Sequence, residues 1–148
     1  MLRDWLLVAH ITAAIVYVGT DLLLTAFIYR ARQSGAVAEF LRTVETAGPF
    51  SAIGAVLLLL SGIALVLVVS GISITTLFVL IGLTVIIASG ASESVYFGRQ
   101  VAVLGALVDA PESAAEVRRR MTQLLVVAGV LDLLKLVTVW AMVFKPGL

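Results

Sequence analysis

The chain has 148 residues, of which 61 % are hydrophobic and only 13 % are charged. An ordinary soluble domain has about 45–50 % apolar and about 25 % charged residues, so this composition excludes a soluble enzyme and a disordered protein and favours lipid as the solvent. The net charge of +1 excludes the basic surface of a nucleic-acid binder, and the absence of cysteine excludes disulfide bonds and thiolate metal sites.

Four apolar stretches are long enough to cross the hydrocarbon core of a bilayer, which takes about 20 residues of helix. Their expected bounds are residues 5–29, 50–69, 74–97 and 121–144. Short connections between consecutive helices favour antiparallel neighbours. We therefore predict an all-α, polytopic membrane protein, in which residues 1–148 form a single antiparallel four-helix transmembrane bundle.

The connections between the spans carry their own signals. Apolar residues recur at i, i+3, i+4 and i+7 from Val37, which predicts a short helix over 36–46 that lies at the membrane interface or packs on the end of the bundle. Residues 70–73 predict a tight turn between the second and third spans. Asp109 and Pro111 are residue types that start a helix ahead of the fourth span.

Basic residues are divided unequally between the two ends of the spans. Seven arginines lie in the loops over 30–49 and 98–120, whereas the other end has Arg3 and Lys145. The positive-inside rule therefore predicts cytoplasmic loops, both termini outside, and a multi-pass protein of the plasma membrane. The length of the first span, and Asp21 within it, argue against a cleaved signal peptide.

Five ionisable side chains fall within the predicted spans. Each charged one opposes insertion by about 2.5–3.5 kcal/mol or more, so it is by default a candidate functional residue. They are His10, Asp21, Glu93, Asp132 and Lys135.

Helical spacing groups these side chains on faces. His10 and Asp21 are eleven residues apart, about three turns, so they share a face with Tyr17 between them, and Asp132 and Lys135 are neighbours at i, i+3. With Glu93 near the inner end of the third span, a polar stripe would cross the membrane if spans one, three and four face each other. Structural alternatives stay open. Asp132 and Lys135 neutralise each other, Glu93 is interfacial, or His10 only bonds a neighbouring helix. Asp21 has no basic residue in its own span, so it is protonated, paired with Lys135, or hydrated in a cavity.

Cofactor chemistry has few candidate ligands. Histidine is the usual axial ligand of haem, and His10 is the only histidine of the chain. His10 is therefore the candidate ligand for haem and also for a metal ion. Ligation by two histidines of one chain is therefore excluded, and Met142 at a comparable depth is the candidate second ligand. A closed zinc site is excluded, and copper binding through His10 and methionines has no clustered motif.

Three short motifs resemble a known family. They are the segment 6–19 with His10 nine residues before Gly19, the segment Ser61-Gly62-Ile63-Ala64-Leu65, and the C-terminal run from Met142 to Pro146. The chain resembles the bacterial membrane family called domain of unknown function 2269 and, more distantly, CopD copper-resistance proteins and HemJ-type protoporphyrinogen oxidases. The HemJ likeness implies haem b on His10. This chain lacks the proline and arginine that follow the histidine in HemJ-type proteins, and it lacks their basic residues in the third span. These differences argue against porphyrinogen oxidation.

Two classes of function remain. The first is an uncharacterised inner-membrane protein that serves as an accessory or cofactor-binding subunit, with haem on His10, in a homo-oligomer or a larger complex. The alternative is proton- or ion-coupled transport through Asp21, Glu93, Asp132 and Lys135. The residues favour a protein that is not an enzyme, with a HemJ-like oxidoreductase as the alternative.

Overall fold

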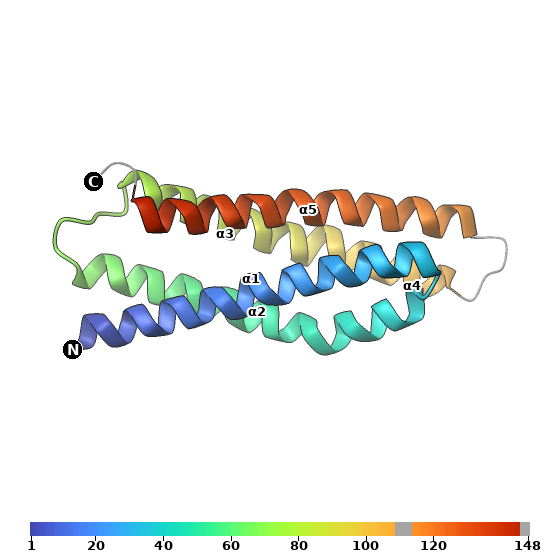
Figure 1. Cartoon of the computed structure of the whole chain (residues 1–148), viewed down its shortest axis with the longest axis horizontal. Coiled ribbons are helices and arrows are strands. Elements are labelled where there is room, and N and C mark those ends of the chain that lie inside the picture. The colour runs from blue at the N-terminus through green and yellow to red at the C-terminus, as the bar shows by residue number, and fades with distance from the viewer. Residues whose placement is uncertain (109–113, 146–148) are drawn as a thin grey trace.

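The computed structural model describes residues 1–108 and 114–145 of the chain, so the predicted helix start at Asp109 and Pro111 lies outside the described residues. The described part is helical, with short connections. Four of its helices are long and apolar enough to cross a membrane. The elements are α1 (Leu2–Ser34), α2 (Val37–Val68), α3 (Leu77–Ala91), the π-helix η1 (Ser92–Phe97), α4 (Gly98–Leu107) and α5 (Ala114–Phe144) (Figure 1).

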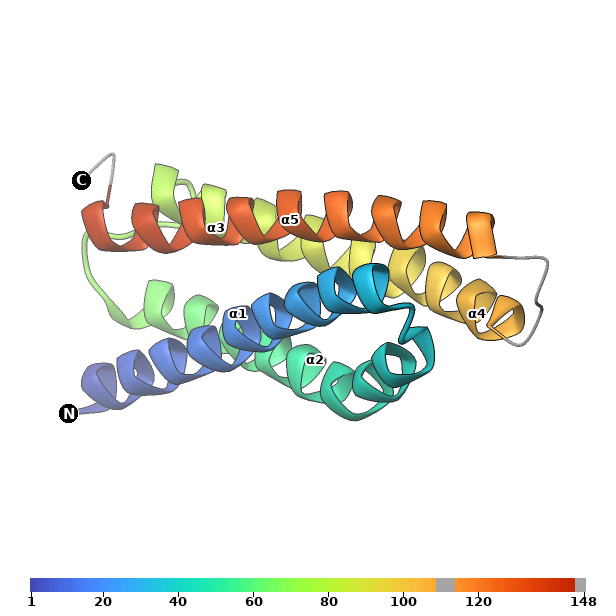
Figure 2. The ribbon, with the colours of Figure 1, turned by 45° about the vertical axis from the view of Figure 1, so that its right-hand side comes forward.

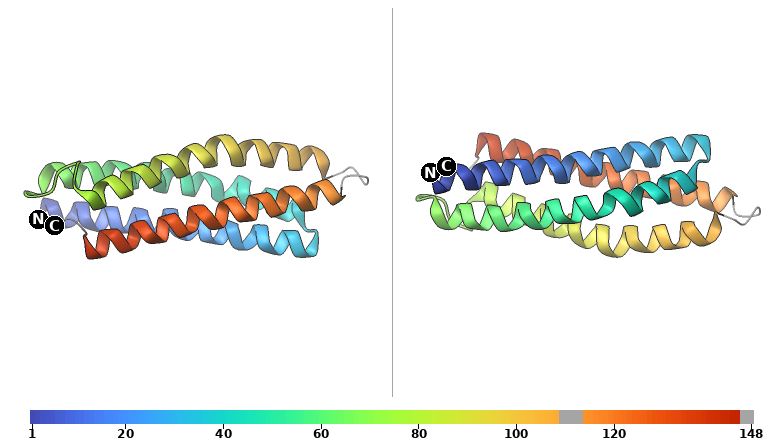
Figure 3. Two further views of the ribbon diagram at one scale, coloured as in Figure 1. Left: turned by 90° about the horizontal axis from the view of Figure 1, so that it is seen from above. Right: turned by 90° about the horizontal axis from the view of Figure 1, so that it is seen from below.

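The helices form an antiparallel bundle, which confirms the predicted fold. α3, η1 and α4 follow one another without a break and together make one long helix. α1 packs along α2, α3 packs along α5, and α1 and α5 join the two pairs. The start of α1, the end of α5 and the connection between α2 and α3 lie at one end of the bundle (Figure 3). The end of α1, the start of α2, α4 and the start of α5 lie at the other end, which we call the arginine-rich end. The seven arginines expected in loops over 30–49 and 98–120 all lie within these helices.

One predicted element is part of a larger one. The helix expected over 36–46 is not separate, because α2 runs from Val37 through Pro49 to Val68. The second span was expected only from residue 50, directly after Pro49, and proline has no N–H to donate and crowds the preceding turn. Membrane helices nevertheless tolerate proline, and the usual result is a bend rather than an end. α2 changes direction in this part (Figure 2).

The turn between α2 and α3 is longer than expected. It occupies residues 69–76, and the third span begins at Leu77 rather than at residue 74. Gly71 has a φ of 84°, a left-handed conformation that glycine adopts without steric penalty. Because α2 packs mainly on α1 and α3 mainly on α5, this turn links two helix pairs instead of closing a tight hairpin.

The apolar core is concentrated toward the arginine-rich end. There the side chains of all four long helices meet and exclude solvent, and many large apolar side chains elsewhere face outward, as in a protein solvated by lipid. The core residues are Ile28, Ala31, Val37, Phe40, Leu104, Met121, Leu124 and Ala128. This packing holds the helices in register beside a layer of buried polar groups in the middle of the bundle.

A buried ion network as the candidate functional site

Lys135 on α5 is the centre of the polar layer. Its Nζ donates to the carboxylate of Asp21 on α1 and, at 2.7 Å, to Oε1 of Glu93 on η1. Lys135 is 4 % exposed and Asp21 is 8 % exposed, so both are shielded from the surroundings of the bundle. Three spans therefore contribute to one ion network, and the predicted convergence of spans one, three and four is found in the structure.

Tyr17 closes the network on the α1 side. Its hydroxyl donates to Oε1 of Glu93 at 3.1 Å, which is the same oxygen that Lys135 contacts. The Lys135 Nζ also lies 4.4 Å from the centroid of the Tyr17 ring, a cation–π geometry. The phenol therefore contributes both a donor to the carboxylate and a negative ring face to the ammonium.

α2 joins the network through a residue that the sequence analysis did not single out. Ser51 Oγ donates to Oδ1 of Asp21 at 2.6 Å, and Ser51 is buried. Two residues of α2 one turn apart, Ser51 and Gly54, both face α1. A Cβ on Gly54 would lie 3.0 Å from the backbone nitrogen of Tyr17, so glycine there allows the two helices to approach closely. A small polar residue one turn before a glycine is the signal that could have indicated this face.

Asp132 has a different partner from the one its spacing suggested. Thr25 Oγ1 on α1 donates to Oδ2 of Asp132 at 2.7 Å. Among the described residues, the ion pairs of Lys135 are with Asp21 and Glu93. The alternative in which Asp132 and Lys135 neutralise each other is therefore not the arrangement found, although both side chains are buried.

The π-helix places Glu93 in this layer rather than at the membrane interface. A π-turn holds one residue more than the α-turn it replaces, and such turns are frequent at functional sites. The Glu93 side chain is 27 % exposed, the most of the three network charges. One α-helical turn before it, Ser89 is fully buried, and its hydroxyl has no partner among the described residues.

The charges of this layer do not balance. Among the described residues, this part of the bundle holds three carboxyl groups, two paired with Lys135 (Asp21 and Glu93) and one bonded to Thr25 (Asp132), but only one ammonium group. Full ionisation would therefore leave two uncompensated negative charges. An unpaired buried charge is far more costly than a neutral group, and buried groups gain or lose protons to avoid it. This arrangement favours uptake of protons or cations at the carboxyl groups.

The candidate cofactor ligands lie apart from this network. The Nδ1 of His10 is 3.1 Å from Ser61 Oγ on α2, and its ring packs on Gly62. Met142 on α5 instead packs against Gly82 on α3. The structure thus directs His10 and Met142 to different neighbouring helices and does not bring them together. No group of three or more histidine, cysteine, aspartate or glutamate residues that could hold a metal is found within residues 1–108 and 114–145.

Comparison with known proteins places the chain in a family. No curated protein and no solved structure matches it. Residues 4–146 match the family described as predicted integral membrane protein (DUF2269). The match covers nearly the whole chain, and the four long apolar helices agree with it. The protein is therefore an integral, multi-pass membrane protein with four spans and belongs to the DUF2269 family.

Proposed function

We propose that this protein conducts protons across the membrane, as a proton relay or as the proton pathway of a coupled transporter, through the network around Lys135. The observation that carries the proposal is the excess of carboxyl groups, Asp21 and Glu93, over the one ammonium of Lys135 in a hydrogen-bonded layer to which all four long helices contribute, with buried Asp132 close by. Chains of intramembrane acids are typical of proton relays in pumps and transporters. This is the transport alternative of the two functional classes, and the geometry favours it.

Each group has a role in this proposal. Lys135 is the fixed counter-ion that keeps one carboxylate charged, and Ser51 and Lys135 hold Asp21 in place. Glu93 is the proton acceptor that exchanges with the surroundings, because its side chain is the most exposed of the three network charges. Asp132, held by Thr25, is the next proton carrier toward the arginine-rich end.

Proton flux into vesicles tests the proposal. The purified protein in liposomes that carry an internal pH dye is given a pH gradient, with potassium and valinomycin to compensate charge. We expect flux above that of empty vesicles, and a return to the empty-vesicle rate in Glu93→Gln and Asp21→Asn. Both substitutions keep the side-chain shape and remove the exchangeable charge.

The control is Glu116→Gln. Glu116 pairs with Arg119 and Arg120 at the arginine-rich end and has no contact with the network. Its variant should conduct like the unmodified protein. Flux that is unchanged in Glu93→Gln and Asp21→Asn, or that is absent in the unmodified protein, would contradict the proposal.

Haem binding through His10, and assembly into a homo-oligomer or larger complex, stay predictions. If His10 binds haem, the purified protein shows a Soret band in its absorption spectrum, and His10→Ala lacks this band. A bound haem could take its second ligand from another chain, since Met142 of the same chain faces α3.

A further inference from the structure

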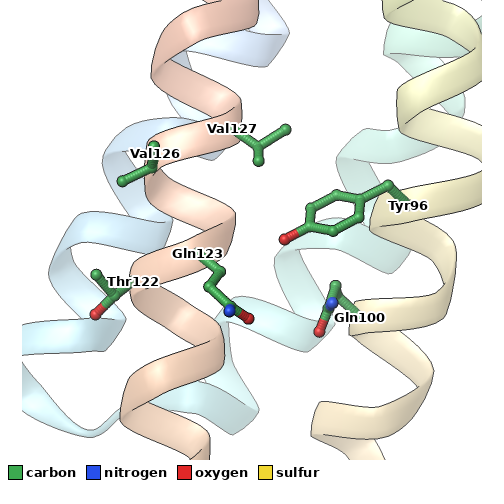
Figure 4. Close-up of a pocket in the computed structure, with 6 residues that line it drawn as sticks. All are labelled: Tyr96, Gln100, Thr122, Gln123, Val126 and Val127. Atoms are coloured by element: carbon green, nitrogen blue, oxygen red, sulfur yellow. The ribbon is translucent and has the colours of Figure 1, made fainter.

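A pocket lies between α5 and the helix formed by η1 and α4, away from the ion network. Its volume is about 470 Å³, within the range of ligand sites. Tyr96 and Gln100 on one helix face Gln123 and Val127 on the other (Figure 4). The lining residues are Tyr96, Gln100, Thr122, Gln123, Val126 and Val127.

The lining combines hydrogen-bonding groups with apolar ones. Two amides, a phenol and a hydroxyl face the pocket together with two valines. Among the described residues, the amide of Gln123 and the hydroxyl of Tyr96 have no hydrogen-bond partner. These groups are therefore available to hydrogen-bond a molecule that enters the pocket.

Two arginines each contact one lining residue of the pocket. Arg32 Nε donates to Thr122 Oγ1 at 2.9 Å, and Arg120 Nη1 donates to Gln100 Oε1 at 2.9 Å. Glu116 pairs with Arg120 and also with Arg119, so of the two arginines that contact the lining, Arg32 has no ion-pair partner among the described residues. No described residue accepts a hydrogen bond from the terminal nitrogens of Arg32, which leaves them available to an anion.

The pocket also lies at the depth of lipid headgroups. Gln123 is nine residues from Asp132, which is near the middle of the predicted fourth span, and nine residues of helix rise about 14 Å. The hydrocarbon core extends about 15 Å on each side of its centre. The amide of Gln123 therefore lies close to the boundary between acyl chains and headgroups.

We propose that this pocket binds an anionic phospholipid, with its phosphate at Arg32 and Arg120 and its headgroup hydroxyls at Gln100, Gln123 and Tyr96. The acyl chains lie along Val126 and Val127 and continue into the bilayer. Guanidinium groups bind phosphate oxygens in a bidentate geometry, and basic pockets between transmembrane helices are typical sites for anionic headgroups. The proposal uses none of the carboxyl groups of the ion network and does not depend on proton conduction.

Native mass spectrometry of the purified protein tests the site. The protein is mixed with phosphatidylglycerol or with phosphatidylcholine of the same acyl chains, and bound lipid is counted. We expect phosphatidylglycerol to be retained preferentially. Arg32→Gln should weaken its binding about fivefold, the effect expected for one arginine near an anionic headgroup. Gln123→Leu should also weaken it, because the amide contact is lost.

Two further variants control for folding. Gln33→Leu makes the same chemical change at an exposed position in the last turn of α1, outside the pocket, and should bind like the unmodified protein. Gln123→Asn keeps an amide and should retain the preference for phosphatidylglycerol. Circular dichroism identifies any variant that has lost its helices, and only variants with full helicity are compared.

Three results would overturn the proposal. The first is equal retention of phosphatidylcholine, which would mean that the pocket does not recognise anionic charge. The second is displacement of the lipid by excess inorganic phosphate, which would assign the site to a free anion. The third is unchanged binding in Arg32→Gln and Gln123→Leu when both variants are folded.

Discussion

A single lysine connects most of the buried charge in this protein. Removing two ions from water carries a large desolvation penalty, which close pairing offsets only when hydrogen bonds satisfy the remaining donors and acceptors. Lys135 meets that condition with two carboxyl groups and the ring of Tyr17. Its removal would leave Asp21 and Glu93 beside each other without a cation.

Lys135→Met should therefore destabilise the protein strongly. The methionine fits the space of the lysine stem, so the loss reflects the unpaired carboxyl groups and should be about 3–5 kcal/mol in the free energy of unfolding. Chemical unfolding in detergent micelles, followed by circular dichroism, measures it. Lys145→Met is the matched control, because Lys145 is exposed beyond the end of α5. Equal effects of the two substitutions would contradict this interpretation of the network.

The four membrane-spanning helices could be predicted from the sequence, but the course of α2 through Pro49 and the π-helix could not. Continuous hydrophobicity over 20 residues is a property of the chain alone, so four spans could be identified. The passage of α2 through Pro49 and the π-helix at Ser92–Phe97 depend on neighbouring helices. Contacts with neighbouring helices determine whether a proline bends a helix or ends it. They also determine whether a helix accommodates the extra residue of a π-turn.

Close packing of α1 on α2 depends on glycine at one position. Gly54→Ala would place a methyl group 3.0 Å from the backbone of Tyr17, and backbone cannot move aside as a flexible side chain can. We expect α1 and α2 to separate locally, with a loss of about 1–3 kcal/mol in the free energy of unfolding. Thermal unfolding in micelles measures the loss.

Gly19→Ala provides the comparison on α1. A Cβ at Gly19 meets nothing within 4 Å, and alanine is a better helix former than glycine. The Gly19 variant should be as stable as the unmodified protein or slightly more stable. A stable Gly54→Ala variant would show that the contact between α1 and α2 is looser than in this structure.

At the scale of the whole molecule, the two ends of the bundle differ in charge. The arginine-bearing parts of α1, α2, α4 and α5 lie at one end, and the start of α1, the end of α5 and the turn over 69–76 lie at the other. A translocated loop rich in arginine is disfavoured, so the arginine-rich end is expected in the cytoplasm.

The absence of cysteine from the chain makes this orientation testable. Ser34→Cys and Ser73→Cys each introduce one thiol at an exposed position, and the two positions lie at opposite ends of the bundle. A membrane-impermeant maleimide applied to intact cells should label Ser73→Cys and not Ser34→Cys. Labelling of Ser34→Cys alone would establish the reverse orientation, with the termini in the cytoplasm.

Hydropathy and charge along the chain were enough to establish a membrane protein with four helical spans and to identify the ionisable residues within them. Hydropathy describes each helix separately, without its neighbours. Packing sets the rotation and register of the helices. These determine that Lys135 contacts Asp21 and Glu93 rather than Asp132, and that Ser51 hydrogen-bonds Asp21. They also turn His10 and Met142 toward different helices. Local sequence offered Lys135 as only one of several alternatives for Asp21 and did not indicate Ser51, because each contact joins residues at least 30 positions apart in the chain.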